Sequence, residues 1–217
     1  MDRAEMKTAS LQTVKRLPAY LVLLRKMLKS GRTAVSSNTI GEMLQIDAIQ
    51  VRKDLSATGI EGKPKVGFCV EEAIGSIEAF LGWDNAREAF IAGAGNLGKA
   101  LIGYPGFSRY GLRIIAAFDS DKSLIGKQAS GVAVLDVSKI TDLAERMHIK
   151  IGIIAVPAEA AQEVCDAMVE GGMKAIWNFA PVKLTVPEDV SVQDEDLASG
   201  LAVLSYKLEK STGGRKR

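Results

Sequence analysis

The sequence is short of the side chains that build metal centres and disulfides. Its 217 residues include only 2 cysteines and 1 histidine. Cys69 and Cys165 lie far apart along the chain, so they lack the close spacing of a redox or zinc pair. With His148 as the single histidine, a structural zinc site is excluded and no other metal site is expected. Such sparse cysteines favour a reduced, cytoplasmic protein.

Long hydrophobic runs are also missing. The longest, such as Ile151–Pro157, are far shorter than the roughly 20 residues of a membrane helix, and no apolar segment follows the charged N-terminus. We therefore expect neither a membrane partner nor a secretory signal. With 47% hydrophobic and 25% charged residues, the chain is expected to fold rather than to stay disordered. Its length fits one large domain or two small ones, at roughly 150 residues per domain.

The net charge of +2 conceals an uneven distribution of charge. Residues 1–67 hold 12 Lys and Arg against 6 Asp and Glu, a formal charge of +6. Residues 68–217 hold 16 against 20, a formal charge of −4. The two parts are therefore expected to meet different partners, with nucleic acid the first candidate for the basic part. The alternative is a solvated basic face without a partner.

The basic part has the helix pattern of a winged helix-turn-helix. We expect helices at Lys15–Ser30 and Ala48–Thr58, with a short helix between them that begins at Ser36 or Ser37. The polar residues before the first helix are expected to fray. A basic hairpin, Gly62–Val70, follows the third helix. Three helices followed by a basic hairpin describe a winged DNA-binding domain.

The third helix offers side chains that read DNA. It exposes a glutamine and an arginine, which suit adenine and guanine edges in the major groove, and a lysine, which suits phosphates. Two more lysines at the hairpin tip are placed to reach the backbone or the minor groove. The alternative is a small helical domain that contacts other proteins. The expected DNA-binding residues are Ser36, Ser37, Gln50, Arg52, Lys53, Lys63 and Lys65.

Beyond an acidic connecting helix that ends near Gly82, strands and helices alternate. The last helix, Asp196–Lys210, carries a leucine stripe. Repeated alternation with apolar strands predicts an α/β domain with a doubly wound parallel sheet of the Rossmann type. The expected strands are Glu88–Ala92, Leu112–Phe118, Val132–Leu135, Lys150–Val156, Ala175–Phe179 and Val190–Val192.

A glycine fingerprint marks the expected ligand site. Gly93, Gly95 and Gly98 follow a strand and open a helix, and Asp119 ends the next strand about 20 residues on. The first glycine makes a tight turn, the second lets the backbone approach a pyrophosphate, and the third lets helix and strand pack closely. Asp119 can accept both ribose hydroxyls and would repel a 2′-phosphate, which favours NAD(H) over NADP(H). The alternatives are another nucleotide-bearing ligand, such as coenzyme A, or no ligand.

Catalysis is not expected. Hydride transfer to a carbonyl needs an acid or base beside the nicotinamide, and His148 precedes a strand, away from the strand carboxyl ends. The nucleotide domain also leaves little room for a substrate domain. We therefore expect no catalytic residues and no small-molecule substrate that is turned over. The alternatives are a small NAD-dependent enzyme with an accessory helical domain and a coenzyme A-binding regulator.

Eight motifs occur in order along nearly the whole chain: Lys15-Arg16-Leu17-Pro18-Ala19-Tyr20, Val35-Ser36-Ser37, Gln50-Val51-Arg52-Lys53-Asp54-Leu55, Gly93-Ala94-Gly95-Asn96-Leu97-Gly98, Tyr104-Pro105-Gly106-Phe107, Phe118-Asp119, Val156-Pro157-Ala158 and Asn178-Phe179-Ala180-Pro181. Together they closely resemble the bacterial redox-sensing transcriptional repressors of the Rex family. The resemblance implies a homodimer with a winged-helix domain and connecting helix at 1–84, a Rossmann NAD(H)-binding domain at 85–195, and a C-terminal helix with a basic tail at 196–217, exchanged between subunits.

The same resemblance implies a function and roles for particular residues. Rex proteins bind palindromic operator DNA, repress genes of fermentative and respiratory metabolism, and leave the DNA when NADH binds. Arg16 resembles an interdomain arginine that pairs with an aspartate of the other subunit, for which Asp196 is the best match. Asp119 would hold the adenosine ribose. The other expected cofactor-binding residues are Gly93, Ala94, Gly95, Asn96, Leu97 and Gly98 at the pyrophosphate, with Tyr104, Val156, Pro157, Asn178, Phe179 and Ala180 elsewhere on the cofactor.

Overall fold

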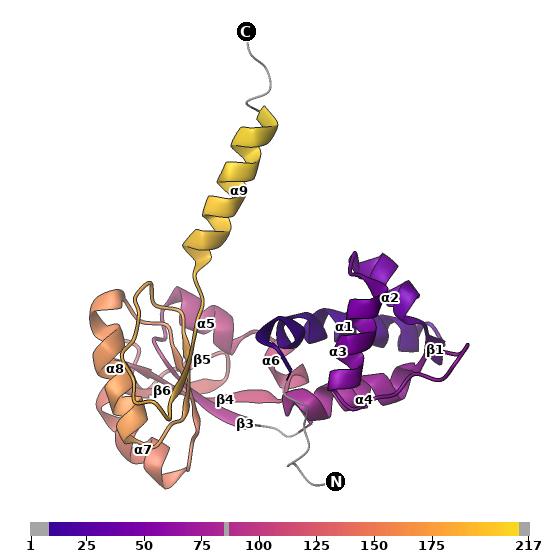
Figure 1. Cartoon of the computed structure of the whole chain (residues 1–217). Coiled ribbons are helices and arrows are strands. Elements are labelled where there is room, and N and C mark those ends of the chain that lie inside the picture. Colours follow the sequence, from indigo (N-terminus) through magenta and orange to yellow (C-terminus); the bar gives the residue numbers. More distant parts are fainter. Residues whose placement is uncertain (1–8, 85–86, 213–217) are drawn as a thin grey trace. The chain divides into compact units, whose positions relative to one another are not determined.

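The structure is a computed structural model, and it describes residues 9–84 and 87–212 (Figure 1). Contacts divide the chain into two compact units. Unit 1 comprises Met1–Ala86 with Arg109–Gly111, and unit 2 comprises Arg87–Ser108 with Leu112–Arg217. The division of the chain at residues 84 and 195 stays a prediction. The expected basic tail lies outside the described residues beyond 212.

Unit 1 is helical, with one short two-stranded sheet. Helix α1 packs against α4, and α2 packs against α3. Leu17, Leu24, Val51 and Ile77 are fully buried in the core that these helices share. Its elements are α1 (Leu11–Lys29), β1 (Ala34–Val35), α2 (Ser37–Leu44), α3 (Ala48–Ala57), β2 (Phe68–Cys69) and α4 (Val70–Leu81).

Helix α1 begins one turn earlier than the sequence predicts. Ser10 caps it, because its hydroxyl accepts a hydrogen bond from the Thr13 amide at 3.1 Å. The expectation that the segment before Lys15 frays is therefore wrong for Leu11 onwards. Pro18 lies inside the helix, and its missing N–H leaves one backbone hydrogen bond of α1 unmade.

The turn between α2 and α3 depends on a glycine. A Cβ at Gly41 would lie 2.4 Å from the Ile46 carbonyl oxygen, so any larger residue would push the two helices apart. Asp47 then begins α3 by accepting hydrogen bonds from the Ile49 and Gln50 amides. The helix-turn-helix is thus set by one small residue and one cap, and its third helix is placed as predicted.

The wing is shorter than the expected hairpin. Lys63 and Gly67 form one antiparallel bridge around a tight turn, with hydrogen bonds of 2.8 and 2.9 Å in the two directions. Beyond the bridge, β2 pairs with β1 instead of continuing the hairpin. Position 67 requires a glycine for two reasons: its φ of 91° is left-handed, and a Cβ there would lie 2.3 Å from the Val35 carbonyl oxygen.

Unit 2 is a seven-stranded sheet in the order β5-β6-β4-β3-β7-β8-β9. All neighbours are parallel except β5 and β6. Leaving out β5, this is the strand order of dinucleotide-binding sheets, and it reverses direction between β3 and β7. The predicted doubly wound sheet is confirmed. Its strands are β3 (Arg87–Ala92), β4 (Leu112–Asp119), β5 (Gln128–Ala129), β6 (Val132–Asp136), β7 (Ile151–Ile154), β8 (Ala175–Asn178) and β9 (Ser191–Asp194).

Successive strand residues point to opposite sides of this sheet, so the sheet has an apolar core on each face, and helices cover both. Phe90 and Phe118 pack with residues of α7 (Ile140–Arg146) and α8 (Ala158–Glu170) in one core. Their neighbours Ile91 and Ala117 belong to the other core, against which residues of α5 (Asn96–Ile102) and α6 (Gly106–Arg109) pack.

The last described element is α9 (Leu197–Thr212). Its large apolar side chains are exposed, among them Leu201 at 65%, Leu204 at 63% and Leu208 at 59%. Across the two described ranges, no helix has both the length and the apolar character that crossing a bilayer demands.

Candidate DNA interface and dinucleotide site

Helix α3 presents a mixed set of side chains at its surface. Arg52 and Lys53 are exposed and Gln50 is half-buried, whereas Val51 and Leu55 are fully buried. This arrangement follows from helical periodicity, in which residues three or four apart share a face. The surface of α3 thus carries the polar side chains that the sequence proposed as readers of DNA.

Ile49 is 60% exposed on α3, and sequence reasoning did not include it among the DNA-binding residues. An apolar side chain in an amphipathic helix is normally assigned to the core, which is why it was missed. The signal was its position two residues after the cap Asp47, in the first turn of α3. An exposed apolar group there can contact the methyl group of thymine.

A groove of about 650 Å³ lies between α3, the start of α2 and the wing. It brings together five of the seven predicted DNA-binding residues but not Gln50 or Lys53, which lie outside it. Within the groove, the Arg52 guanidinium donates a long hydrogen bond of 3.4 Å to the Ser37 hydroxyl. Its lining includes Ser36, Ser37, Arg52, Lys63 and Lys65.

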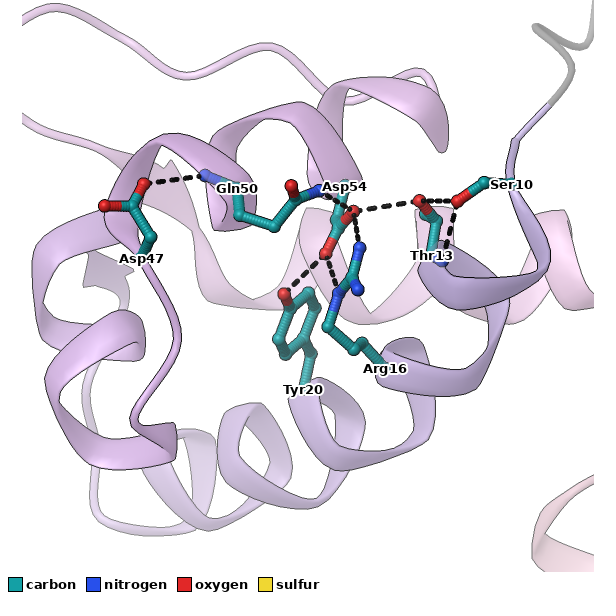
Figure 2. Close-up of polar contacts among 7 residues, drawn as sticks. All are labelled: Ser10, Thr13, Arg16, Tyr20, Asp47, Gln50 and Asp54. Atoms are coloured by element: carbon teal, nitrogen blue, oxygen red, sulfur yellow. Dashed lines mark hydrogen bonds and ion pairs between the residues drawn. The ribbon is translucent and has the colours of Figure 1, made fainter.

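Asp54 on α3 is the centre of a buried polar cluster (Figure 2). Its side chain is 1% exposed. Arg16 donates to its two carboxylate oxygens at 2.6 and 2.8 Å, and Tyr20 donates at 2.7 Å. Thr13 and Gln50 donate to Oδ1 at 3.0 and 2.8 Å. Sequence reasoning missed this cluster.

The cluster keeps Asp54 ionised. Burial by itself raises the pKa of the carboxyl group, but hydrogen bonds from Arg16, Tyr20, Gln50 and Thr13 outweigh burial and bring the pKa below its usual value. Burial and the hydrogen bond to Asp54 raise the pKa of Tyr20, so its hydroxyl stays a donor. Arg16 is therefore paired inside unit 1.

Asp196, the expected partner of Arg16 across a dimer, caps α9. Its carboxylate accepts hydrogen bonds from the Ala198 and Ser199 amides at 2.9 and 3.1 Å and from the Ser199 hydroxyl. The Ser199 hydroxyl is the main cause of the lowered pKa of Asp196. The side chain is exposed, and the pairing of Arg16 with Asp196 of a second subunit stays a prediction.

The glycine fingerprint lies at the end of β3, where the strand order reverses. A Cβ at Gly93, whose φ is 96°, would lie 2.3 Å from the Ala155 carbonyl oxygen beyond β7. A Cβ at Gly98 would lie 1.8 Å from the Gly93 carbonyl oxygen, whereas one at Gly95 would meet no atom within 4 Å. The first and third glycines are thus required by packing, and the second leaves open space beside the backbone.

Asp119 holds this loop in place. Its Oδ2 accepts a hydrogen bond from the Ala94 amide at 2.7 Å, and its Oδ1 accepts one from the Asp121 amide at 2.9 Å. Each carboxylate oxygen has a second lone pair, so both bonds leave Asp119 able to accept from ribose hydroxyls. The side chain is half-buried at the carboxyl end of β4.

A cavity of about 500 Å³ opens at this edge of the sheet. Of the predicted cofactor residues, five line it: Gly93, Gly95, Asp119, Val156 and Pro157. Sequence reasoning missed two stretches of the cavity wall, one after β6 and one on α8. Both follow carboxyl ends of parallel strands, which share one edge of the sheet, and this could have revealed them. The missed residues are Val137, Ser138 and Thr141 after β6, and Ala160, Glu163, Val164 and Ala167 on α8.

The remaining predicted residues do not line this cavity. Some belong to a chain of aromatic rings: Tyr104 contacts Phe107 at 5.0 Å between ring centroids, Phe107 contacts Trp177 at 5.4 Å, and Trp177 contacts Phe179 at 5.0 Å. Trp177 was not predicted, and its indole N–H donates to Glu195 at 2.9 Å. The aromatic chain supplies the apolar surface that a nicotinamide ring would need.

Asn178 is fully buried, and its side chain is occupied within the chain. Its amide nitrogen donates to the Val182 carbonyl and to Asp194, and its carbonyl oxygen accepts from the Ala180 amide at 3.0 Å. These bonds fix the turn that carries Phe179 and Ala180. Asn178 therefore positions the expected cofactor residues, and its own contact with a cofactor stays a prediction.

Comparison with known proteins supports both units. Residues 9–56 match the family described as putative DNA-binding protein N-terminus, and residues 84–182 match the family described as CoA binding domain. The redox-sensing transcriptional repressor Rex of Treponema denticola is 47% identical, over 94% of this chain and 98% of its own. That of Bacteroides fragilis is 41% identical, over 90% of this chain and 89% of its own.

Solved structures agree with these sequence matches. A crystal structure of RSP in complex with β-NAD⁺ and operator DNA has a TM-score of 0.89 and 36% identity, and the match covers 94% of both chains. RSP is a Rex-family repressor, and its complex with β-NADH has a TM-score of 0.85 and 35% identity, over 94% of this chain and 96% of that one. The identity extends over nearly the whole chain, so this protein is a regulator rather than an enzyme and belongs to the Rex family of redox-sensing transcriptional repressors.

Proposed function

We propose that this chain binds palindromic operator DNA as a homodimer and leaves it when NADH binds unit 2. It would thereby couple the cytoplasmic NADH/NAD⁺ ratio to the transcription of fermentative and respiratory genes. One observation carries the proposal: a single chain joins a basic helix-turn-helix with a cavity at the reversal point of a dinucleotide-binding sheet. Such reversal points are where doubly wound sheets bind their ligands.

The DNA contacts divide into reading and positioning. Arg52 suits a guanine edge and Gln50 an adenine edge, because both offer two hydrogen-bonding atoms in one plane. The protein groove beside α3 is lined by Lys63 and Lys65, whose charges suit DNA phosphates. Such contacts would fix α3 in the major groove of the DNA without reading its sequence.

The fingerprint loop would hold the cofactor at its pyrophosphate. Open space at Gly95 lets an anion approach the backbone, and the first N–H groups of α5 have no partner inside the helix. Asp119 would accept the adenosine ribose hydroxyls and disfavour a phosphate there. These features fit NAD(H), which RSP binds in both of its redox forms.

The preference for NADH would follow from charge. The nicotinamide ring is positive in NAD⁺ and neutral in NADH, and burying an unpaired charge among apolar groups is costly. Phe107 and Phe179 are half-buried, and with Pro181 they offer such a surface. A 100-fold preference corresponds to about 2.7 kcal/mol, which lies within the usual range of allosteric coupling.

A second copy of the chain is the expected partner of α9. Leu201 and Leu204 lie three residues apart and are both more than half exposed. Apolar stripes of this kind are normally covered in the functional assembly. Exchange of α9 between two subunits would bury the stripe, and closure of the two nucleotide domains by NADH would move two recognition helices out of register with half-sites about 34 Å apart.

A gel-shift titration on the full-length protein tests this proposal. Operator DNA selected by the protein from a random pool is bound at fixed salt, and NADH or NAD⁺ is added. We expect NADH to release the DNA at concentrations at which NAD⁺ does not. Binding of NADH without any change in DNA affinity would overturn the proposal.

Coenzyme A is the alternative ligand, because residues 84–182 match the family described as CoA binding domain. The adenosine of coenzyme A carries a 3′-phosphate, which Asp119 would repel. Adding coenzyme A to the same titration and to a thermal melting assay distinguishes the two ligands. A melting shift with coenzyme A and none with NADH would favour the alternative.

A further inference from the structure

Asp54 stands out because it belongs to the recognition helix but points into the protein. It lies on the same face of α3 as Val51 and Leu55, which are fully buried. Five hydrogen bonds reach its carboxylate: three at Oδ1, from Thr13, Arg16 and Gln50, and two at Oδ2, from Arg16 and Tyr20 (Figure 2). Four of these five bonds come from α1.

The fifth bond comes from Gln50, the residue expected to read an adenine. Gln50 and Asp54 are four residues apart on α3, so their side chains lie one above the other. The Gln50 amide nitrogen donates to Asp54 Oδ1 at 2.8 Å. The side chain of Gln50 is half-buried, so part of it remains available at the surface.

The charge of Asp54 decides which way the Gln50 amide faces. An ionised carboxylate accepts hydrogen bonds and donates none, so it attracts the amide N–H and repels the amide oxygen. Arg16 contributes a positive charge at 2.6 Å, which favours the ionised form. With Asp54 ionised, a flipped Gln50 would place two acceptors against each other in a buried site.

The fixed orientation leaves the right atoms free for adenine. A glutamine amide has two N–H groups and one oxygen, and Asp54 takes one N–H. The other N–H and Oε1 remain, and these form the donor and acceptor pair that matches adenine N7 and N6 in the major groove. A freely rotating amide would offer its donor and acceptor in either order.

We infer that Asp54 is a specificity-determining positioning residue, which holds the Gln50 amide in the orientation that reads adenine. The inference rests on the proposed function, because it takes Gln50 as a contact of the operator. Its new element is that base reading by α3 depends on a carboxylate that does not face the DNA. Since α1 supplies Thr13, Arg16 and Tyr20, the first helix sets the reading orientation of the third.

A double-mutant cycle with full-length protein tests this inference. Wild type, Asp54→Asn, Gln50→Ala and the double variant are titrated against the selected operator and against each of its single base-pair substitutions, at one salt concentration. The base pair at which Gln50→Ala loses discrimination identifies the position that Gln50 reads. The replacement asparagine has nearly the same size as the aspartate, but it can offer either a donor or an acceptor.

We expect Asp54→Asn to reduce discrimination at that one base pair by about ten-fold, within the range of one bidentate contact. In the Gln50→Ala background, the same change should have no effect there. The matched control is Asp47→Asn, which removes a charge from the start of the same helix but keeps a good cap. It should leave the whole discrimination profile unchanged.

Two results would overturn the inference. A loss of affinity that is equal for all operator variants, or one that persists in the Gln50→Ala background, would mean that Asp54 only stabilises the fold. If Asp54→Asn no longer melts cooperatively, hydrogen exchange of the Gln50 side-chain amide is measured by NMR in the wild-type protein instead. One of its two N–H protons should be protected by Asp54; equal exchange of both protons would overturn the inference. Wild-type protein without any operator preference would refute the proposed function itself, which is a separate outcome.

Discussion

At the scale of single residues, the two outer glycines of the fingerprint are required by packing, whereas the middle one is not. Gly93 and Gly98 are required because a Cβ at either would lie within 2.3 Å of a backbone oxygen. Gly95 has no such contact. Its small size is needed only when a ligand comes close to the backbone.

This difference gives a prediction for two alanine variants. Gly95→Ala should change the free energy of unfolding by no more than about 0.5 kcal/mol, because it adds a methyl group to open space. It should weaken NADH binding by about ten-fold, or about 1.4 kcal/mol. Gly98→Ala should destabilise unit 2 by about 1–3 kcal/mol, because its Cβ would clash with the Gly93 oxygen. Thermal melting and NADH titration of both variants measure these effects; equal melting temperatures would show that Gly98 is not under steric constraint.

The lowered pKa of Asp54 leads us to expect that the stability of the protein depends on pH. Its pKa is lowered in the folded protein, so the carboxylate contributes stability above the usual carboxyl pKa of about 3.9, and this contribution is lost as the pH falls through the lowered value. Asp54→Asn should cost on the order of 3 kcal/mol at pH 7, because it breaks a buried ion pair. The cost should shrink below about pH 4. Denaturant unfolding of the two proteins across pH 3–7 measures it, and a constant difference over this range would contradict the prediction.

The Asp54 cluster was outside the reach of the sequence, although part of its signal was present. Asp54 lies on the same face of α3 as the buried Val51 and Leu55, so helical periodicity could have indicated an inward carboxylate. The partners could not be identified, because Thr13 and Arg16 lie 41 and 38 residues away, and such contacts depend on how α1 and α3 pack. The glycine loop, in contrast, was predictable because its geometry is set by neighbours in the sequence.

At the scale of elements, local signals decided what could be predicted. Caps and periodicity gave α3 and the six parallel strands of the sheet within one or two residues, whereas the short antiparallel strand β5 was not predicted. The start of α1 was misjudged because the apolar residues of its first turn, Leu11 and Val14, do not continue the buried stripe: Leu11 is 78% exposed and Val14 is half-buried. The wing was expected as a hairpin, but β2 pairs with β1, a choice between two partners that the local sequence does not reveal.

We expect the wing to contribute to the salt dependence of DNA binding. Lys65 is exposed at the tip of the turn and lines the groove beside α3. If it contacts a phosphate, Lys65→Ala should lower the slope of log K against log[salt] by about 1 and weaken all DNA sequences alike. Lys26→Ala is the matched control, because Lys26 is an exposed lysine of α1 that does not line the groove. Filter-binding titrations at several salt concentrations give the slope, and a sequence-dependent loss would instead assign base reading to the wing.

At the scale of the whole molecule, the two units contain the two halves of a switch. In the proposed function, unit 1 would hold the DNA surface and unit 2 the cofactor cavity, so a signal would have to pass between them or between two copies of the chain. The sequence implied this division through its charge, which is positive before residue 68 and negative after it. In the proposed dimer, the link between the halves would depend on α9, because its exposed leucines offer a surface for a second copy.

Leu204 therefore tests the assembly. Leu204→Asp places a charge in the centre of the exposed stripe of α9, where burial against a second chain would require its desolvation. We expect sedimentation to show a shift from dimer to monomer. Because one subunit reaches one half-site only, operator affinity should fall by at least about 100-fold, while NADH binding to the monomer should persist if the cavity of unit 2 is sufficient.

Ser205→Asp, which adds the same charge about a quarter of a turn away, should have the smaller effect. A Leu204→Asp protein that stays dimeric and keeps its operator affinity would mean that α9 is not the dimer interface, and the register of the two recognition helices would then have to be set by another surface.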